Sequence, residues 1–291
     1  SEEHYSMPET STTIKSGSIV SPELPIEFIN TGELDIKTTY VLPVTIKSVE
    51  GIGVLQSAKT YYYVFRGASL INVVCNISRN RAYPDFKNDS KFNNLTENTM
   101  EILFKANSFP NTLNTLMGIE SNYLLRIGDA TIPNNQLQVA TSVNNCTSAD
   151  LQLESGKWYH VAVAFNKGNV KVYINGVEKL SGSTGKSSVS LGAKHTNEED
   201  GSRCFWVGYS YKDDRYFDGV VSEVRIWNRA LTAEEIQATN HFYTIEPESE
   251  GLIAYWKFDE GSGTVAKDYS VSGYDLTIEK EPKWESVSLP Q

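Results

Sequence analysis

Cysteine and histidine are scarce in this chain of 291 residues, which contains three cysteines and four histidines. Cys75, Cys146 and Cys204 have no close spacing and form no CxxC pair, so a Cys/His metal cluster is nearly excluded. An odd number of cysteines cannot pair completely within one chain. Two alternatives remain, one disulfide with a buried thiol or three small buried hydrophobic side chains, and the second is favoured.

Basic charge and long apolar runs are also missing. Lys and Arg number 26 against 36 Asp and Glu, which gives a net charge of −10 and argues against a general nucleic-acid binder. No apolar run approaches the roughly 20 residues of a transmembrane helix. The first residues contain no charged-then-apolar leader, so an export signal was either removed or never present. We expect no nucleic-acid partner and no transmembrane segment, and a lipid anchor would lie outside this chain.

Alternating β-branched and aromatic residues, bounded by Gly, Pro and Asn, dominate the sequence and predict strands. About 66 residues is a marginal length for an independent core. We therefore predict a small β-domain over 1–66 and a larger domain over 67–291. Runs of this kind in the smaller domain are 26–29, 40–46 (in which Pro43 indicates an edge or a bulge) and 60–65.

The larger part of the chain is predicted to be antiparallel β-structure with one short helix. Asn175-Gly176 is typical of a type I′ hairpin turn. Thr232 and Glu235 form a capping-box pattern, which predicts a helix near 232–240. The clearest predicted strands are 99–105, 123–127, 136–141, 158–166, 169–174, 204–211, 220–227 and 252–258.

Three of these segments resemble a known family. Residues 156–165 (GKWYHVAVAF) and 170–176 (VKVYING) resemble the central hairpin of the laminin-G-like domains of the concanavalin A-like lectin/glucanase superfamily. Residues 220–236 resemble its penultimate strand and short helix. The resemblance implies an antiparallel jelly-roll β-sandwich with one concave face.

A narrower resemblance comes from the order of the motifs. Residues 252–263, with Asp268 and Gly273, are similar to a laminin-G-like signature that opens the domain in most relatives but closes it here. This order resembles surface lipoproteins of glycan-foraging gut bacteria, in which a domain of unknown function precedes the laminin-G-like domain. Residues 1–66 resemble the second half of that first domain, so we expect a trimmed chain or a reduced domain. The other matching motifs are 117–120, 125–130 and 282–285 and, near the N-terminus, 7–9, 14–17 and 40–44.

Catalytic carboxylates are not evident. A glucanase of this superfamily needs two carboxylates across the scissile bond, and relatives present them through a Glu-x-Asp-x-x-Glu motif on one strand. This motif is absent, and of Glu97 and Glu101 only Glu101 is expected within a strand. We therefore expect no enzymatic activity.

The densest mixture of aromatic and polar residues is 205–216, which predicts a sugar-binding surface. Period-2 alternation places Phe205, Val207, Tyr209 and Tyr211 on one face and Trp206 on the other. The alternative is that the aromatic residues are sheet core and the polar residues form internal ion pairs. The candidate carbohydrate-binding residues are Glu120, Arg126, Tyr209, Tyr211, Asp213, Asp214 and Tyr216.

The resemblance also implies a calcium ion at the loop edge. Calcium prefers six to eight oxygen ligands, and Asp129 and Asp218 are the candidate metal residues. The alternative is that such residues only form turns. His160 is expected to be a packed structural histidine, whereas His195 and His241 are expected to be isolated.

Together these features predict a non-catalytic carbohydrate-binding protein, either an outer-membrane lipoprotein at the cell surface or a secreted protein. Its role would be to capture oligo- or polysaccharide for a glycan-utilisation system, with partner proteins of glycan import. The alternatives are a structural or protein–protein interaction module and, third, a glycoside hydrolase.

Overall fold

The computed structural model describes residues 4–31, 34–35, 38–66, 70–195 and 203–290. The chain forms two compact units, one of residues 1–70 with 288–291 and the other of residues 71–287. None of the described helices has the length and apolar composition that crossing a membrane requires.

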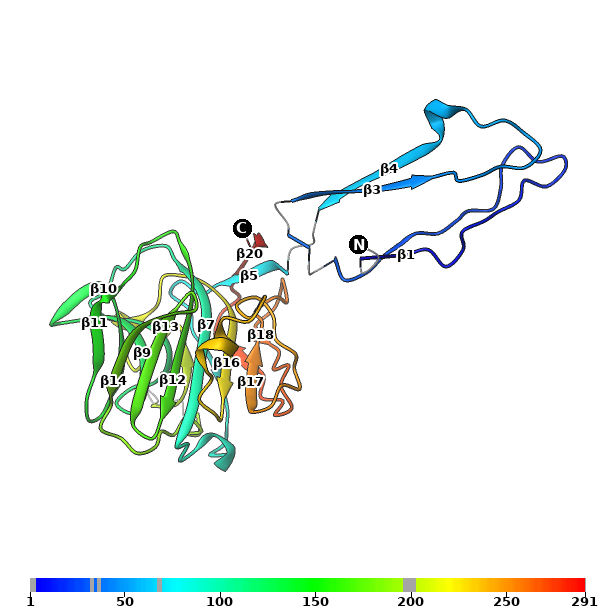
Figure 1. The fold of residues 1–291 in the computed structure, drawn as a ribbon. Helices are drawn as coiled ribbons and strands as arrows, with labels where there is room; N and C mark the ends of the chain where they lie inside the picture. The colour runs from blue at the N-terminus through cyan, green and yellow to red at the C-terminus, as the bar shows by residue number, and fades with distance from the viewer. Residues whose placement is uncertain (1–3, 32–33, 36–37, 67–69, 196–202, 291) are drawn as a thin grey trace. The chain divides into compact units, whose positions relative to one another are not determined.

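The smaller unit contains two short antiparallel pairs. β1 (Tyr5–Ser6) pairs with β2 (Glu27–Phe28), and β3 (Thr39–Thr45) pairs with β4 (Thr60–Arg66), preceded by the 3-10 turn η2 (Gln56–Ala58). Within the described residues β3 has no other partner, as expected for a strand that contains proline. The β3–β4 hairpin is drawn in blue and cyan in Figure 1.

The larger unit is an antiparallel sandwich of two sheets, which confirms the predicted fold class. The first sheet has the order β11 (Cys146–Gln152), β10 (Ile132–Thr141), β9 (Tyr123–Asp129), β8 (Asn114–Ile119), β15 (Trp206–Val207), β6 (Ala82–Pro84), β19 (Leu276–Ile278) and β18 (Val265–Ala266). The second has the order β14 (Val177–Ser183), β13 (Asn169–Ile174), β12 (Trp158–Asn166), β7 (Glu97–Ala106), β16 (Gly219–Trp227), β5 (Ile71–Asn76) and β20 (Lys283–Leu289), and β17 (Leu252–Trp256) also pairs with β16.

The central strands β12, β7 and β16 of the second sheet are buried on both faces. Successive side chains of a strand point to opposite sides, so each of these strands contributes to two layers of packing. Val161, Val163 and Phe165 of β12 join the main core of the sandwich. Ala162 and Ala164 join a second cluster with Trp227, Ile236 and neighbouring side chains. Ile236 belongs to helix α1 (Ala233–Ile236), so this short helix packs on part of the outer face of this sheet. Figure 1 shows β14, β13, β12, β7, β16 and β17 side by side.

Local sequence signals explain several boundaries of these elements. Asn175 and Gly176 have φ values of 49° and 77°, as a type I′ turn requires. The Thr232 hydroxyl accepts a bond from the Glu235 amide, and the Glu235 carboxylate accepts one from the Thr232 amide, so the predicted capping box is confirmed. All three cysteines are buried and form no disulfide, which is the favoured alternative.

Several predicted strand boundaries differ from the structure, for example 136–141, which is part of the longer β10, and two of the differences concern residues considered for function. β7 begins at Glu97, so Glu97 and Glu101 lie in the same strand. The predicted strand over 204–211 is reduced to β15, which contains two residues. Gly208, with φ of 78°, turns the backbone out of the extended conformation directly after β15.

Candidate functional site

The aromatic segment after residue 204 does not form the single face that alternation predicts. Phe205 belongs to the main core, whereas Trp206 and Tyr209 lie in a separate cluster with Tyr83 and Tyr216 packed against it. The Arg81 guanidinium lies 5.0 Å from the Trp206 ring centroid and 4.5 Å from that of Tyr209. The prediction that Phe205 and Tyr209 share a face is therefore wrong, because the turn at residue 208 reverses the alternation.

Two candidate residues, Glu120 in the turn after β8 and Arg126 in β9, are occupied by protein partners. Glu120 forms an ion pair with Arg215, with 2.8 Å between Glu120 Oε2 and Arg215 Nη1. Arg126 is buried, donates from Nε and Nη2 to Gln138 Oε1 at 2.9 and 2.6 Å, and forms an ion pair with Asp129. This is the internal ion-pair arrangement that the sequence left open as the alternative.

The predicted residues Tyr211 and Asp214 lie on a short turn. Tyr211 is half-buried, and the nearest cation over its ring is the Arg203 guanidinium, at 4.8 Å. The 3-10 turn η4 (Asp213–Arg215) follows, and Asp214 on it is exposed. Neither residue contributes to the cleft described next.

An open cleft of about 790 Å³ lies among four loops of the larger unit. Of the predicted site residues it contains Asp213, Tyr216 and Asp218. The hydroxyl, amide and cationic side chains from the other loops were missed, because their segments are far apart in sequence and carry no motif. The complete lining is Ser78, Arg79, Ser108, Pro110, Asn111, Asp213, Tyr216, Phe217, Asp218 and Lys280.

Hydrogen bonds fix the loops that form this cleft. The buried Asn80 donates from Nδ2 to the Lys280 carbonyl at 2.7 Å and accepts from the Lys280 amide at 3.2 Å. Asn111 donates from Nδ2 to the Tyr216 carbonyl at 2.9 Å. The walls are therefore largely formed before any ligand arrives, as is typical of small-molecule sites.

Tyr216 supplies the aromatic surface of the cleft. Its ring is half-buried and lies 5.0 Å from that of Tyr209. Burial raises the pKa of Tyr216 to about 12, although the nearby Arg81 opposes this effect. The phenol is therefore protonated at neutral pH and can donate a hydrogen bond, while the ring can stack on an apolar face.

Asp218 is the carboxylate with the most protein donors in the cleft. Ser78 and Ser108 donate their hydroxyl groups to it at 2.8 and 2.5 Å, and the Asn107 amide donates at 3.3 Å. Burial raises the pKa of Asp218, but these three hydrogen bonds outweigh it, and the net pKa lies below the usual value. Asp218 is therefore an ionised acceptor.

The carboxylates of the two predicted calcium residues, Asp129 and Asp218, both interact with other groups of the protein. Asp129 holds Arg126 and accepts a bond from the Ala130 amide at 2.7 Å, and a cation there would meet the guanidinium charge. Asp218 has both carboxylate oxygens occupied by hydroxyl and amide donors. As placed, this pair does not fit a calcium ion, and calcium binding stays a prediction.

The hydrogen bonds to Asp218 give a pH-dependent prediction. Because its pKa is lowered in the folded state, ionised Asp218 stabilises the fold above the ordinary aspartate pKa of about 3.9. This contribution is lost as pH falls through the lowered value. We expect Asp218→Asn to reduce the free energy of unfolding at pH 7, and the difference from wild type to shrink below about pH 4. Urea unfolding between pH 3 and 7 measures it, and a constant difference would contradict it.

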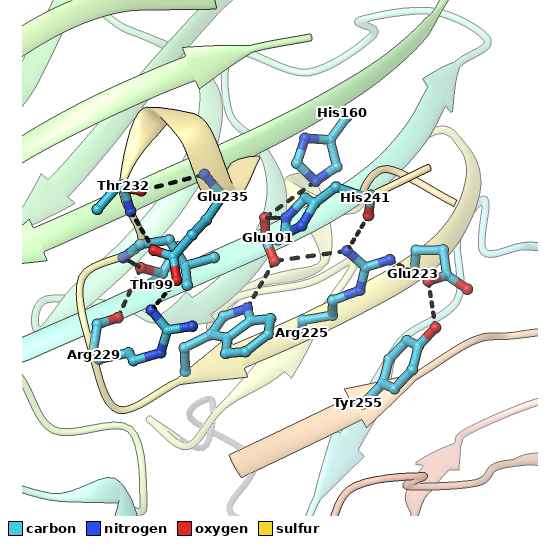
Figure 2. Close-up of polar contacts among 12 residues, drawn as sticks. Thr99, Glu101, His160, Glu223, Arg225, Arg229, Thr232, Glu235, His241 and Tyr255 are labelled. Carbon is cyan, nitrogen blue, oxygen red and sulfur yellow. Dashed lines mark hydrogen bonds and ion pairs between the residues drawn. The ribbon is translucent and has the colours of Figure 1, made fainter. Parts of the chain in front are cut away.

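A second polar cluster lies on the outer face of the second sheet (Figure 2). Glu101 of β7 is fully buried, and its Oε1 lies 2.6 Å from His241 Nε2 and 3.4 Å from His160 Nε2. The expectation that His241 is isolated is wrong, because the segment after α1 folds back over β7. The same expectation is wrong for His195, whose ring stacks on Tyr83 with centroids 3.5 Å apart. His160 is the packed histidine expected, although its ring nitrogens make no hydrogen bond with the described residues.

Charge in this cluster is balanced by Arg225 of β16. The guanidinium forms an ion pair with Glu223, lies 3.7 Å from Glu101 Oε2 and donates to the His241 carbonyl at 2.7 Å. Burial raises the pKa of Glu101, but its contacts with the two imidazoles bring the pKa well below its usual range. Burial lowers the pKa of His160, and Glu101 only partly opposes this, so the imidazole is neutral.

Comparison with known proteins places the larger unit among lectin-like folds. A family model described as the concanavalin A-like lectin/glucanases superfamily matches residues 80–237. A second model, for an N-terminal domain, matches residues 1–53. A search of curated proteins found no match.

Solved structures with a similar fold include a proposed carbohydrate-binding protein of Bacteroides ovatus. It is 26% identical with a TM-score of 0.66, and the match covers 98% of this chain and 79% of that one. Domain 4 of the arabinanase AbnA of Geobacillus stearothermophilus is 19% identical with a TM-score of 0.43, covering 71% and 88%. A SAP-like pentraxin of Limulus polyphemus is 14% identical with a TM-score of 0.41, covering 60% and 83%.

Proposed function

The chain belongs to the concanavalin A-like lectin/glucanase superfamily, and on this basis we propose that it is a non-catalytic carbohydrate-binding protein whose site is the cleft around Tyr216. The observation that carries the proposal is the half-buried ring of Tyr216 in a preformed cleft, surrounded by hydroxyl, amide, carboxylate and cationic groups, while the second aromatic residue of the lining, Phe217, is fully buried. A pyranose presents an apolar C–H face and a rim of hydroxyl groups, and this lining complements both. The Bacteroides ovatus protein described above supports the assignment.

The arrangement of carboxylates supports binding rather than cleavage. A glycosidase needs a general acid with a raised pKa beside a second carboxylate. In the cleft, Asp218 has a lowered pKa and three hydrogen-bond donors. Outside it, Glu101 is fully buried beneath His241, and Glu120 is paired with Arg215. None of these three groups has the environment that protonation of a leaving group requires.

The cellular role that we propose is capture of oligo- or polysaccharide at a bacterial surface, by an outer-membrane lipoprotein or a secreted protein. Such a protein would act with partner proteins of glycan import. The motif order described above motivates this role. The alternative, a protein-interaction module, is favoured by one feature of the smaller unit: Tyr61, Tyr62 and Val64 of β4 expose 67%, 61% and 65% of their surface.

Titration calorimetry against a panel of plant and host polysaccharides and oligosaccharides tests the proposal. We expect saturable binding to at least one class of glycan without release of reducing sugar. Titrations with calcium and with chelator determine whether calcium contributes. Absence of binding across the panel in both conditions would contradict the proposed function, and release of reducing sugar would show a glycosidase.

A further inference from the structure

The outer face of the second sheet brings together three side chains of metal-ligating types from distant segments. Glu101 lies on β7, His160 on the neighbouring β12, and His241 on the segment after α1 (Figure 2). One ligand atom from each residue lies within 4.8 Å of the other two, and all three residues are buried. This cluster shares no residue with the cleft around Tyr216.

His160 is the unusual member, because a buried polar group normally has a hydrogen-bond partner. The residue is 1% exposed, and neither ring nitrogen makes a hydrogen bond with the described residues. Its ring stacks on Phe242, with centroids 4.4 Å apart and planes at 13°. This packing fixes the ring so that Nε2 lies 3.4 Å from Glu101 Oε1. Nε2 therefore has only this long contact with Glu101, which lacks hydrogen-bond geometry, and such an arrangement destabilises the fold unless something else binds the nitrogen.

We propose that Glu101, His160 and His241 bind one divalent transition-metal ion, for which zinc has the best chemical fit. Two imidazoles and one carboxylate are a common ligand set for zinc, with a water molecule as the fourth ligand. Ligand bonds of about 2.0–2.2 Å in a tetrahedral site separate neighbouring ligand atoms by about 3.3 Å. The 3.4 Å between Glu101 and His160 matches this value, and the 2.6 Å between Glu101 and His241 must open by less than about 1 Å.

The surroundings of the cluster orient the proposed ligands. Trp227 donates from Nε1 to Glu101 Oε2 at 2.7 Å, which leaves Oε1 directed at the two histidines. Outer contacts of this kind fix ligand geometry in metal sites. Arg225 carries the nearest positive charge, but its ion pair with Glu223 offsets that charge. The bound ion would join the segment after α1 to β7 and β12 and would stabilise the larger unit.

The test uses the full chain, first treated with chelator and dialysed. We expect it to bind one equivalent of zinc and, with zinc at about 100 times Kd, to unfold at a temperature higher by roughly 5 °C or more. Cobalt(II) should give the visible absorption of a four-coordinate site. X-ray absorption of the zinc-loaded wild type should show two imidazoles and only nitrogen and oxygen ligands. Uptake below a tenth of an equivalent, or sulfur in the ligand shell, would overturn the proposal.

Two matched variants locate the site. His160→Phe keeps a ring that can stack on Phe242 but removes both nitrogens, so the metal-free variant should fold and bind no zinc. His195→Gln changes a histidine outside the cluster, whose Nδ1 lies 3.2 Å from Cys204 Sγ, and should bind zinc as the wild type does. Zinc retained in His160→Phe, or lost only in His195→Gln, would overturn the proposal.

Discussion

Replacement of Arg225 by methionine is expected to lower the free energy of unfolding by about 3–5 kcal/mol. Methionine fills much of the same volume but removes the charge that neutralises two buried carboxylates. Glu223, whose pKa burial raises in spite of Arg225, would keep only its hydrogen bond from the Tyr255 hydroxyl, at 2.6 Å. Glu101 would lose the cation 3.7 Å away, and the His241 carbonyl would lose its donor. Urea unfolding with and without chelator measures the change.

An ion pair at the surface, between the end of β16 and helix α1, provides the control. Arg229 lies 2.6 Å from Glu235, and both side chains are about a third exposed. Arg229→Met should therefore cost about 1 kcal/mol or less. Arg225→Lys should fall between the two, because lysine keeps the charge but not the planar fork that reaches Glu223 and the His241 carbonyl together. Equal losses in Arg225→Met and Arg229→Met would contradict the prediction.

The β-sandwich could be predicted from the sequence because its signals are local. The predicted bounds of β12 and β13 match the structure, since their alternation is uninterrupted and a type I′ turn follows at Asn175-Gly176. The capping box at Thr232 also depends on residues three positions apart. In each case the stabilising contacts join neighbours in the chain or in the hairpin, and the residue pattern alone specifies them.

The functional sites could be predicted only in part, because they depend on contacts between distant residues. The mixture of aromatic and polar residues over 205–216 predicts Tyr216, and the resemblance implies Asp218 only as a calcium ligand. Lys280 enters the cleft through Asn80, 200 positions away. His241 reaches Glu101 across 140 positions, and no spacing rule connects them. The alternation over 204–211 predicts one shared aromatic face, and this is wrong, since positive φ values at Gly208 and Tyr211 interrupt the extended backbone.

Replacement of Tyr216 by alanine is expected to weaken glycan binding tenfold or more, equivalent to about 1.4 kcal/mol or more. Alanine removes the aromatic surface of the cleft, while Asn111 still holds the backbone carbonyl at this position. Tyr216→Phe keeps the ring and loses the phenol donor, so its loss should correspond to one hydrogen bond, about 0.5–1.5 kcal/mol. Calorimetric titration with the best ligand of the panel measures both variants, and thermal unfolding checks that each is folded.

Tyr211→Ala distinguishes the cleft from the surface that alternation predicts. Tyr211 was a candidate on the sequence, but it lies outside the cleft lining, near Arg203 and Lys212. If the cleft is the binding site, Tyr211→Ala should change the affinity by less than about threefold, within the range of ordinary surface substitutions. Loss of binding in Tyr211→Ala, with normal binding in Tyr216→Ala, would move the site from the cleft to the turn at 211–215. The two substituted residues are five positions apart, Tyr211 before η4 and Tyr216 directly after it, so the pair of variants distinguishes the two neighbouring surfaces.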